Sequence, residues 1–173
     1  MELPKRKQNR LAEYDYSTPN AYFITICTYN RRNLFWKGVE AIIDLPENVP
    51  LTDLGRIVQQ GIEDISQHYP MVSVDHHVIM PNHVHLIIMF NNSYYPDYDR
   101  KDSSDGKTSF GPQSNNLPSI IRGIKSSVKK YANDNKIIFE WHKRYHDRII
   151  RNHNEMNNIA EYIENNPIKW DLR

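Results

Sequence analysis

The sequence predicts an α+β fold of the ferredoxin-like type, with an antiparallel sheet and helices packed on one side of it. This prediction depends first on the order of segments, which is strand, helix, strand, strand, helix, an extended piece and a last helix. It depends also on the turn Pro81-Asn82, which joins two adjacent strands into a hairpin. The 173 residues fit one domain, 1–173, with enough chain to bury a core.

Three strands are expected from runs of β-branched and aromatic residues. These runs cover residues 22–28, 72–80 and 83–90. A fourth extended region, 137–150, is expected to hold one or two short strands. The short connection between the second and third strands makes them neighbours in the sheet.

Three helices are expected from apolar residues that recur three and four positions apart. The first begins near Leu51 and closes before Pro70, the second covers about 118–133, and the last covers about 154–165 and ends at Pro167. Residues 91–116 are rich in Asn, Ser, Asp, Tyr and Gly and hold almost no aliphatic side chains. That composition predicts a long flexible loop inserted in the domain, not a boundary between domains.

The composition is that of a globular protein of the cytoplasm. Hydrophobic residues make up 39% and charged residues 25% of the chain. No apolar run is long enough for a membrane span, and no apolar stretch follows the basic residues at the start. Because Cys27 is the single cysteine, no internal disulfide can form, and a reducing compartment is expected. We therefore expect a cytoplasmic protein without a membrane partner.

The formal net charge of +1 conceals a separation of charge along the sequence. Acidic residues dominate from 39 to 75, and basic residues dominate from 117 to 151. A basic half is compatible with a polyanion such as nucleic acid bound on one face, although solvated helix faces are the alternative. The candidate DNA-binding residues are Arg122, Lys125, Lys129, Lys143, Arg144, Arg148 and Arg151.

His83 and His85 are the first candidates for chemistry. They lie two positions apart on a predicted strand, so both side chains leave the same face and can share one metal ion. Two histidines are too few for a closed structural site, which favours an open site. The alternative is a pair of partly buried, hydrogen-bonded rings.

Tyr162 and Asn166 are the second pair of candidates, because they lie four apart on one face of the last predicted helix. A tyrosine oxygen can attack phosphorus, and an amide oxygen can ligate a hard cation. In the alternative interpretation, Tyr162 is an aromatic side chain at the edge of the core and Asn166 belongs to a helix stop. Since Pro167 disfavours helical dihedrals at Asn166, Asn165 is the reserve ligand.

Several motifs carry a family resemblance. The segment Met80-Pro-Asn-His-Val-His-Leu-Ile-Ile88 resembles the His-hydrophobic-His motif of the HUH single-tyrosine transposases. The segment Glu161-Tyr-Ile-Glu-Asn-Asn-Pro-Ile-Lys-Trp170 resembles the C-terminal signature of one group among them, the REP-associated tyrosine transposases. Further matching segments, in the same order as in that group, are 22–32, 120–126 and 141–152. The resemblance thus spans about residues 22–170.

The resemblance implies a ferredoxin-like fold with the HUH histidines on a central strand and the tyrosine on a C-terminal helix. It implies His83 and His85 as metal ligands, Asn166 as the third ligand and Tyr162 as nucleophile. The partner it implies is single-stranded DNA near short hairpins, and the cofactor is Mg²⁺ or Mn²⁺. Ligand softness alone favours zinc or manganese for two imidazoles, so magnesium enters only through the family.

The implied reaction is DNA cleavage and rejoining through a 5′-phosphotyrosine intermediate. Two other functions remain open at this point. One is a non-catalytic protein that binds hairpin DNA, and the other is a metal-dependent phosphoesterase acting on small molecules. The sequence leaves the oligomeric state open between a monomer and a homodimer.

Overall fold

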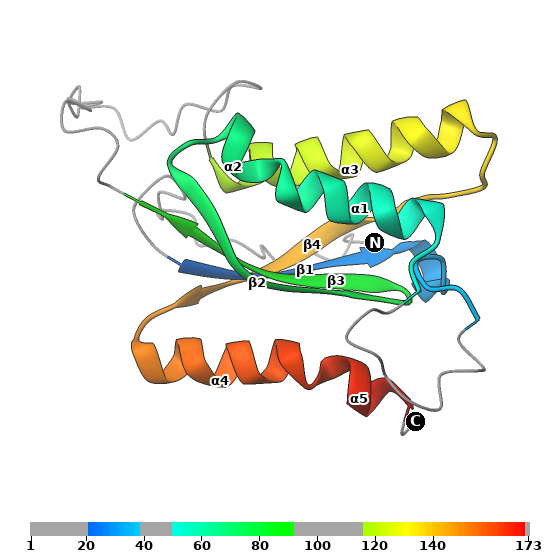
Figure 1. Ribbon diagram of the computed structural model, residues 1–173. Coiled ribbons are helices and arrows are strands. Elements are labelled where there is room, and N and C mark those ends of the chain that lie inside the picture. Colours follow the sequence, from blue (N-terminus) through cyan, green and yellow to red (C-terminus); the bar gives the residue numbers. More distant parts are fainter. Residues whose placement is uncertain (1–20, 39–49, 92–115, 172–173) are drawn as a thin grey trace, which may run out of the picture.

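The computed structural model describes residues 21–38, 50–91 and 116–171. Figure 1 shows a central sheet with helices above and below it. The sheet is antiparallel with the strand order β2-β3-β1-β4, so β3 and β1 are the inner strands. The strands are β1 (Ala21–Thr28), β2 (Val72–Met80), β3 (His83–Phe90) and β4 (Trp141–Ile150). The predicted α+β fold is confirmed. Of the predicted loop 91–116, residues 92–115 lie outside the described residues.

Helices cover both faces of the sheet, so the prediction that they lie on one side was wrong. Figure 1 places α1, α2 and α3 above the sheet and α4 and α5 below it. The helices are the short 3-10 turn η1 (Tyr29–Arg31), α1 (Asp53–Glu63), α2 (Ile65–His68), α3 (Leu117–Asp134), α4 (His153–Glu164) and α5 (Asn166–Asp171). Within the described ranges, every helix is too short or too polar to cross a membrane.

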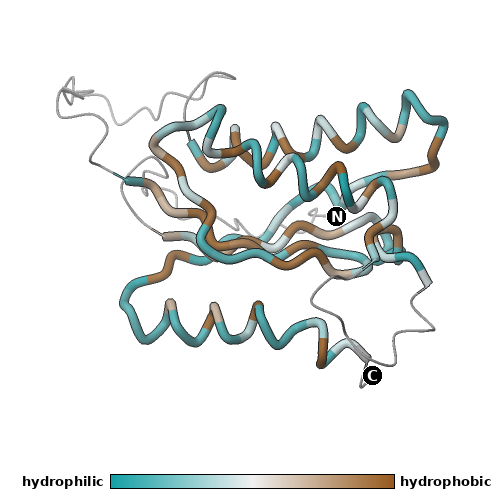
Figure 2. Tube along the Cα trace, viewed as in Figure 1, coloured by the Kyte–Doolittle hydropathy of each residue, from teal (hydrophilic) through white to brown (hydrophobic). Residues whose placement is uncertain are grey.

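The larger core lies between the sheet and the layer of α1 and α3. Along β3, Val84, Leu86 and Ile88 point into this core, as the alternation of the sequence predicts. Figure 2 shows apolar positions of the upper helices turned toward the sheet. Side-chain caps begin α1 and α3, since Thr52 accepts a hydrogen bond from the Gly55 amide and Asn116 from the Ser119 amide.

A second, smaller core explains the helix layer on the other face. Ile87 and Ile150 of the sheet pack there with Ile159 and Ile163 of α4. Because the face of the sheet that carries the histidines also carries apolar residues, it needs cover from water. The smaller core supplies that cover and fixes α4 against the sheet.

Two local predictions were wrong. Region 137–150 holds one strand of ten residues, β4, instead of short pieces. Pro167 does not end the helical path, because α4 stops at Glu164 and α5 begins at Asn166 with Pro167 in its first turn. A proline is tolerated there because the first amides of a helix have no partner within it.

Candidate active site

His83 and His85 lie on β3, an inner strand, and point toward the layer of α4 and α5. Their side chains leave the face opposite Val84 and Leu86, which are in the larger core. Both are buried, at 7% and 5% exposure, and their ring centroids are 4.6 Å apart. Two imidazoles this close on one face can share a single cation.

The ring of His83 is oriented by its chain neighbour. Its Nδ1 lies 2.7 Å from Oδ1 of Asn82. An amide oxygen only accepts hydrogen bonds, so Nδ1 carries the proton and Nε2 carries the lone pair that a metal needs. Asn82, which sequence reasoning did not select as a site residue, is itself buried and donates from Nδ2 to the carbonyl of Arg31 at 3.2 Å.

The ring of His85 is held from two sides. Its Nδ1 lies 2.8 Å from Oγ1 of Thr25, which is its partner across the β1–β3 pairing. Its Nε2 lies 3.4 Å from the hydroxyl of Tyr162. If Nδ1 donates to the threonine, Nε2 presents its lone pair on the side of the tyrosine. Sequence reasoning missed Thr25, because only the pairing of strands far apart in the sequence brings it to the site.

His85 is neutral over the physiological range of pH. Burial lowers the pKa of its imidazole to about 4, a backbone hydrogen bond at Ile24 acts in the opposite direction, and the charge of Arg31 lowers the pKa further. Only the neutral ring can coordinate a metal ion. The surroundings of His85 thus favour the form that a metal site requires.

Tyr162 projects from α4 at the boundary between the smaller core and solvent. Its ring packs against His85 and Phe23 with centroid separations of 5.3 and 6.1 Å. The residue is nevertheless 43% exposed. Its phenol oxygen is therefore anchored beside a histidine and still accessible to a polymeric substrate.

Asn166 begins α5 and lies between two aromatic residues that contact the histidines. Tyr162, four residues before it, packs on His85, and Trp170, four residues after it, packs on His83 with a centroid separation of 6.0 Å. Asn166 is buried, and its Nδ2 has no hydrogen-bond partner. Because the two ends of an amide can exchange by rotation, an oxygen can occupy that unsatisfied position. An unpaired buried amide fits a ligand to a hard cation.

The available donors fit an open cation site. Within the described ranges, no three His, Cys, Asp or Glu side chains gather as a metal cluster. Cys27 lies across from His83 in the strand pairing, but burial raises the pKa of its thiol, which keeps it protonated. Two imidazoles and an amide therefore leave positions that substrate oxygens can fill.

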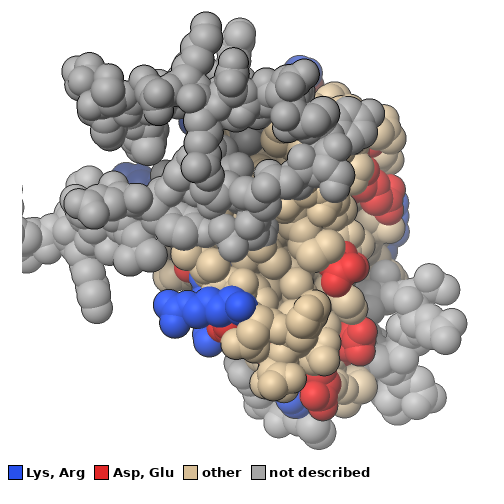
Figure 3. All heavy atoms as spheres, turned by 90° about the vertical axis from the view of Figure 1, so that its left-hand side faces the viewer, with Lys and Arg blue, Asp and Glu red and all other residues tan. Residues whose placement is uncertain are grey.

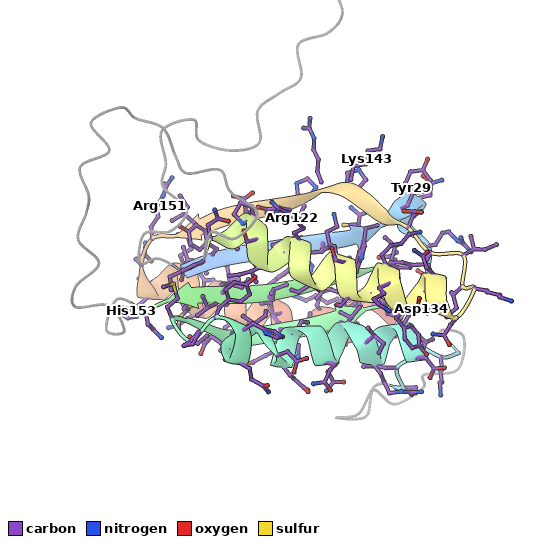
Figure 4. The ribbon with its side chains drawn as sticks, turned by 90° about the horizontal axis from the view of Figure 1, so that it is seen from above. Tyr29, Arg122, Asp134, Lys143, Arg151 and His153 are labelled. Atoms are coloured by element: carbon purple, nitrogen blue, oxygen red, sulfur yellow. The ribbon has the colours of Figure 1, made fainter. Side chains whose placement is uncertain are left out.

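The predicted DNA-binding residues are divided between the two faces of the sheet. Arg122, Lys125, Lys129 and Lys143 line a groove of about 720 Å³ between α3 and β4, on the face away from the histidines. Figure 4, seen from above, shows Arg122 and Lys143 on this side. Two of these cations hold the fold, since Lys125 donates to the carbonyl of His142 and Lys129 to that of Phe139.

Two of the remaining basic candidates lie on the face of the sheet that carries the histidines. Since Lys143 and Tyr145 face the α3 groove, the alternation of β4 turns Arg144 and Arg148 to the face of α4. Arg148 forms an ion pair with Glu155 of α4, and the Arg151 amide donates to the same carboxylate. On the face shown in Figure 3, most visible acidic side chains lie on the right and the most prominent basic one on the left.

Trp141, the first residue of β4, belongs to the larger core. It is buried against Phe35 and Phe139, and its indole donates to the carbonyl of Lys125 at 3.1 Å. Tyr145 is half-buried and packs against the same core. The larger core uses these aromatic side chains, which leaves little ring surface for DNA.

Comparison with known proteins gives relatives along nearly the whole chain. No protein-family model matches. A Haemophilus influenzae protein named only as uncharacterized is 36% identical over 172 residues, which are 96% of this chain and 90% of the relative. Another protein from that organism, named "Putative REP-associated tyrosine transposase", is 25% identical over 158 residues, 90% of this chain and 74% of the relative.

A solved structure shares the fold. It is a REP-associated tyrosine transposase bound to a REP hairpin, and it superposes with a TM-score of 0.57. The two chains are 18% identical, and the match covers 98% of this chain and 74% of the other. At that identity the likeness establishes the common architecture, in which a sheet carries helices on its faces.

Proposed function

We propose that the chain is a REP-associated tyrosine transposase, like the relative of that name and the solved structure of the same fold, and that it cleaves and rejoins single-stranded DNA. The observation that carries the proposal is the tyrosine–histidine contact. The hydroxyl of Tyr162 lies 3.4 Å from Nε2 of His85, whose ring is 4.6 Å from that of His83. A nucleophile beside a pair of buried imidazoles is the arrangement that metal-assisted attack on a phosphodiester needs.

The donor set supports a divalent cation, Mg²⁺ or Mn²⁺, held by His83, His85 and Asn166. When bound, the cation would supply positive charge beside the scissile phosphate, where negative charge grows in the transition state. The imidazoles make manganese the better match to the protein, and magnesium is the harder alternative. The unsatisfied amide of Asn166 is the feature of this chain that favours a third ligand at that point.

In the proposed reaction the phenol oxygen of Tyr162 attacks the phosphorus in line. A bond forms between this oxygen and phosphorus while the bond from phosphorus to the DNA 3′ oxygen breaks. The phenol gives up its proton to water and the leaving 3′ oxygen takes one up, so the products are a 5′-phosphotyrosine and a free 3′-hydroxyl. Because the phosphoester bond is kept in the adduct, another 3′-hydroxyl can reverse the step and join strands without ATP.

The proposed substrate is single-stranded DNA that contains a hairpin. The solved relative is bound to a REP hairpin, and we extend that class of ligand to this chain. Tyr162 lies beside buried rings at the surface of α4, and a flexible strand can bring its phosphate there more easily than a stiff duplex can. Such DNA would be met in the cytoplasm.

A covalent-adduct experiment tests the proposal. Hairpin oligonucleotides from the DNA that flanks the gene, labelled on the 3′ side of the expected cut, are incubated with protein and Mn²⁺ and separated on a denaturing gel. We expect a labelled protein band that disappears with EDTA and with Tyr162→Phe. Tyr131→Phe, on α3 beyond the sheet, is the matched control and should keep the band.

Two outcomes would replace the proposal. Tight hairpin binding without an adduct would indicate a non-catalytic DNA-binding protein, for which the basic groove of α3 and β4 gives a separate surface. Steady turnover of a small phosphodiester without an adduct would indicate a phosphoesterase. Native gel mobility and release of nitrophenol from a model diester distinguish the two.

A further inference from the structure

The turn η1, directly after β1, has an unusual backbone. Asn30 and Arg31 both have φ of 53°, in the left-handed region. Asparagine tolerates that region, but arginine rarely adopts it. Two consecutive residues of this kind persist only where surrounding contacts hold them, and such strain tends to occur at functional sites.

The contacts that hold η1 come from the turn before the histidines. The Thr28 amide donates to the carbonyl of Asn82 at 2.9 Å, and the Thr28 hydroxyl lies 3.1 Å from that carbonyl. The Asn82 side chain donates from Nδ2 to the Arg31 carbonyl at 3.2 Å and accepts at Oδ1 from Nδ1 of His83. One buried amide therefore links the strained arginine to a candidate metal ligand.

The turn presents two side chains with no evident structural task. Tyr29 is 51% exposed, and Figure 4 shows it at the edge of the molecule, where its amide donates to the carbonyl of Glu140 just before β4. Arg31 is exposed, and no acidic residue in the described ranges forms an ion pair with it. Its charge lowers the pKa of both His85 and Cys27, so the guanidinium lies within electrostatic reach of the site.

Arg32 gives an internal comparison. It is exposed and carries the same charge, but its Nη1 donates to the carbonyl of Ile138 at 3.4 Å. The Arg32 carbonyl also accepts from the Thr28 hydroxyl at 2.9 Å. Arg32 therefore ties the turn to the segment before β4, whereas the side chain of Arg31 is left for a ligand.

We propose that η1 is a docking point for single-stranded DNA beside the cleavage site, where Arg31 binds a backbone phosphate that flanks the scissile one and Tyr29 stacks on a base. This inference rests on the proposed function. A guanidinium matches two phosphate oxygens at once, and an exposed aromatic ring offers a face to any base. The α3 groove cannot take this role, because it lies on the other face of the sheet from Tyr162.

Binding without cleavage tests the docking point. The full chain carries Tyr162→Phe, EDTA is present, and the anisotropy of a short fluorescein-labelled oligothymidine is followed at several salt concentrations. Arg31→Gln should weaken binding about tenfold and reduce the salt dependence by the equivalent of about one phosphate contact. Tyr29→Ala should weaken it about fivefold or more. Arg32→Gln, the matched control, should change it less than about threefold.

Arg31→Gly separates loss of the side chain from damage to the turn. Glycine adopts a φ near 53° without a steric penalty, so this variant should unfold at the same or a higher temperature. It should nevertheless bind DNA as weakly as Arg31→Gln. Native affinity in Arg31→Gly, or equal losses in the Arg31 and Arg32 variants, would overturn the proposal.

The binding measurement tests the docking point independently of the cleavage reaction. Neither the nucleophile nor a metal is needed for the binding signal. A selective effect at Arg31 together with a failed adduct assay would leave the docking point standing and remove the catalytic function. A normal adduct together with equal DNA affinities of the Arg31 and Arg32 variants would leave the catalytic function standing and remove the docking point.

Discussion

At the scale of single residues, the site depends on neighbours that fix the two histidines. Thr25 holds Nδ1 of His85 from the adjacent strand, and Asn82 holds Nδ1 of His83 from the adjacent turn. Partners of this kind set the tautomer and the direction of the lone pair before any cation arrives. The donor geometry is therefore prepared by hydroxyl and amide groups that do no chemistry themselves.

Thr25→Val should weaken Mn²⁺ binding by roughly 10- to 100-fold, because the hydroxyl that orients His85 is replaced by a methyl group of similar size. Isothermal titration calorimetry measures the affinity. Thr25→Ser retains the hydroxyl and should bind Mn²⁺ almost as the native chain does. Equal affinities in the Val and Ser variants would show that this contact does not position the ring.

The pKa of His85 gives the metal-free protein a pH-dependent stability. The folded value is about 4 against the ordinary 6.5, so the unfolded chain binds more protons between these values. The free energy of unfolding should therefore fall as pH is lowered through this window, by up to about 3 kcal/mol from this group. Urea unfolding with EDTA at several pH values measures the fall.

His85→Gln is the control, because it removes the titrating ring. It should make the free energy of unfolding depend less on pH. Burial also lowers the pKa of His77, which contributes in the same direction and remains in the variant. The difference between the two profiles therefore isolates His85. Parallel profiles would mean that the ring is protonated as easily in the folded state as in the unfolded one.

At the scale of elements, α4 carries the nucleophile on a small anchor. Ile159 and Ile163 are its buried side chains, and they meet only a few apolar residues of the sheet. The helix that places Tyr162 is therefore less strongly held than the helices on the larger core. Its docking controls the separation between the phenol and His85.

Ile163→Ala should lower the free energy of unfolding by about 2–4 kcal/mol and slow adduct formation, because it opens a cavity between the sheet and the helix that carries Tyr162. Chemical denaturation and the gel assay measure the two effects. Ile168→Ala, at a site 54% exposed in the neighbouring helix, should change stability by less than about 0.5 kcal/mol. Comparable losses in both variants would contradict the proposed anchor.

The sequence correctly predicted the elements whose signals lie within a short segment. The predictions were incomplete where the structure depends on contacts between segments far apart in the sequence. The spacing of Leu54, Val58 and Ile62 identifies α1 directly. By contrast, β4 mixes charged and apolar residues as an exposed edge strand, so its full length becomes evident only from its pairing with β1. The second helix layer and Thr25 were missed for the same reason, since both depend on contacts between distant segments.

At the scale of the whole molecule, the sheet separates two surfaces with different tasks. One face buries the larger core beneath α1 and α3, and the other carries the histidines beneath α4 and α5. Basic residues that are near one another in the sequence are divided between the two faces. A DNA molecule that used both would have to pass around the β4 edge, where Lys143 and Arg144 point to opposite sides.

This division predicts that the α3 groove affects affinity but not cleavage. The double variant Arg122→Gln, Lys143→Gln should weaken binding of a hairpin oligonucleotide about tenfold at moderate salt, because two phosphate-binding charges are lost. At saturating DNA its rate of adduct formation should equal that of the native chain, since Tyr162 and both histidines lie beyond the sheet. Anisotropy titrations and the denaturing gel measure these quantities on the same preparations.

The double variant Lys37→Gln, Arg56→Gln removes the same charge outside the groove and serves as the control. Both side chains are exposed, and Arg56 belongs to the acidic segment that contains α1. This control should bind the hairpin within about threefold of the native chain. Equal loss of hairpin affinity in both double variants would mean that only the net charge matters. Unchanged affinity in both would mean that the groove is a solvated helix face that does not bind DNA. A slower adduct in the groove variant at saturating DNA would instead mean that the two faces act on one continuous strand.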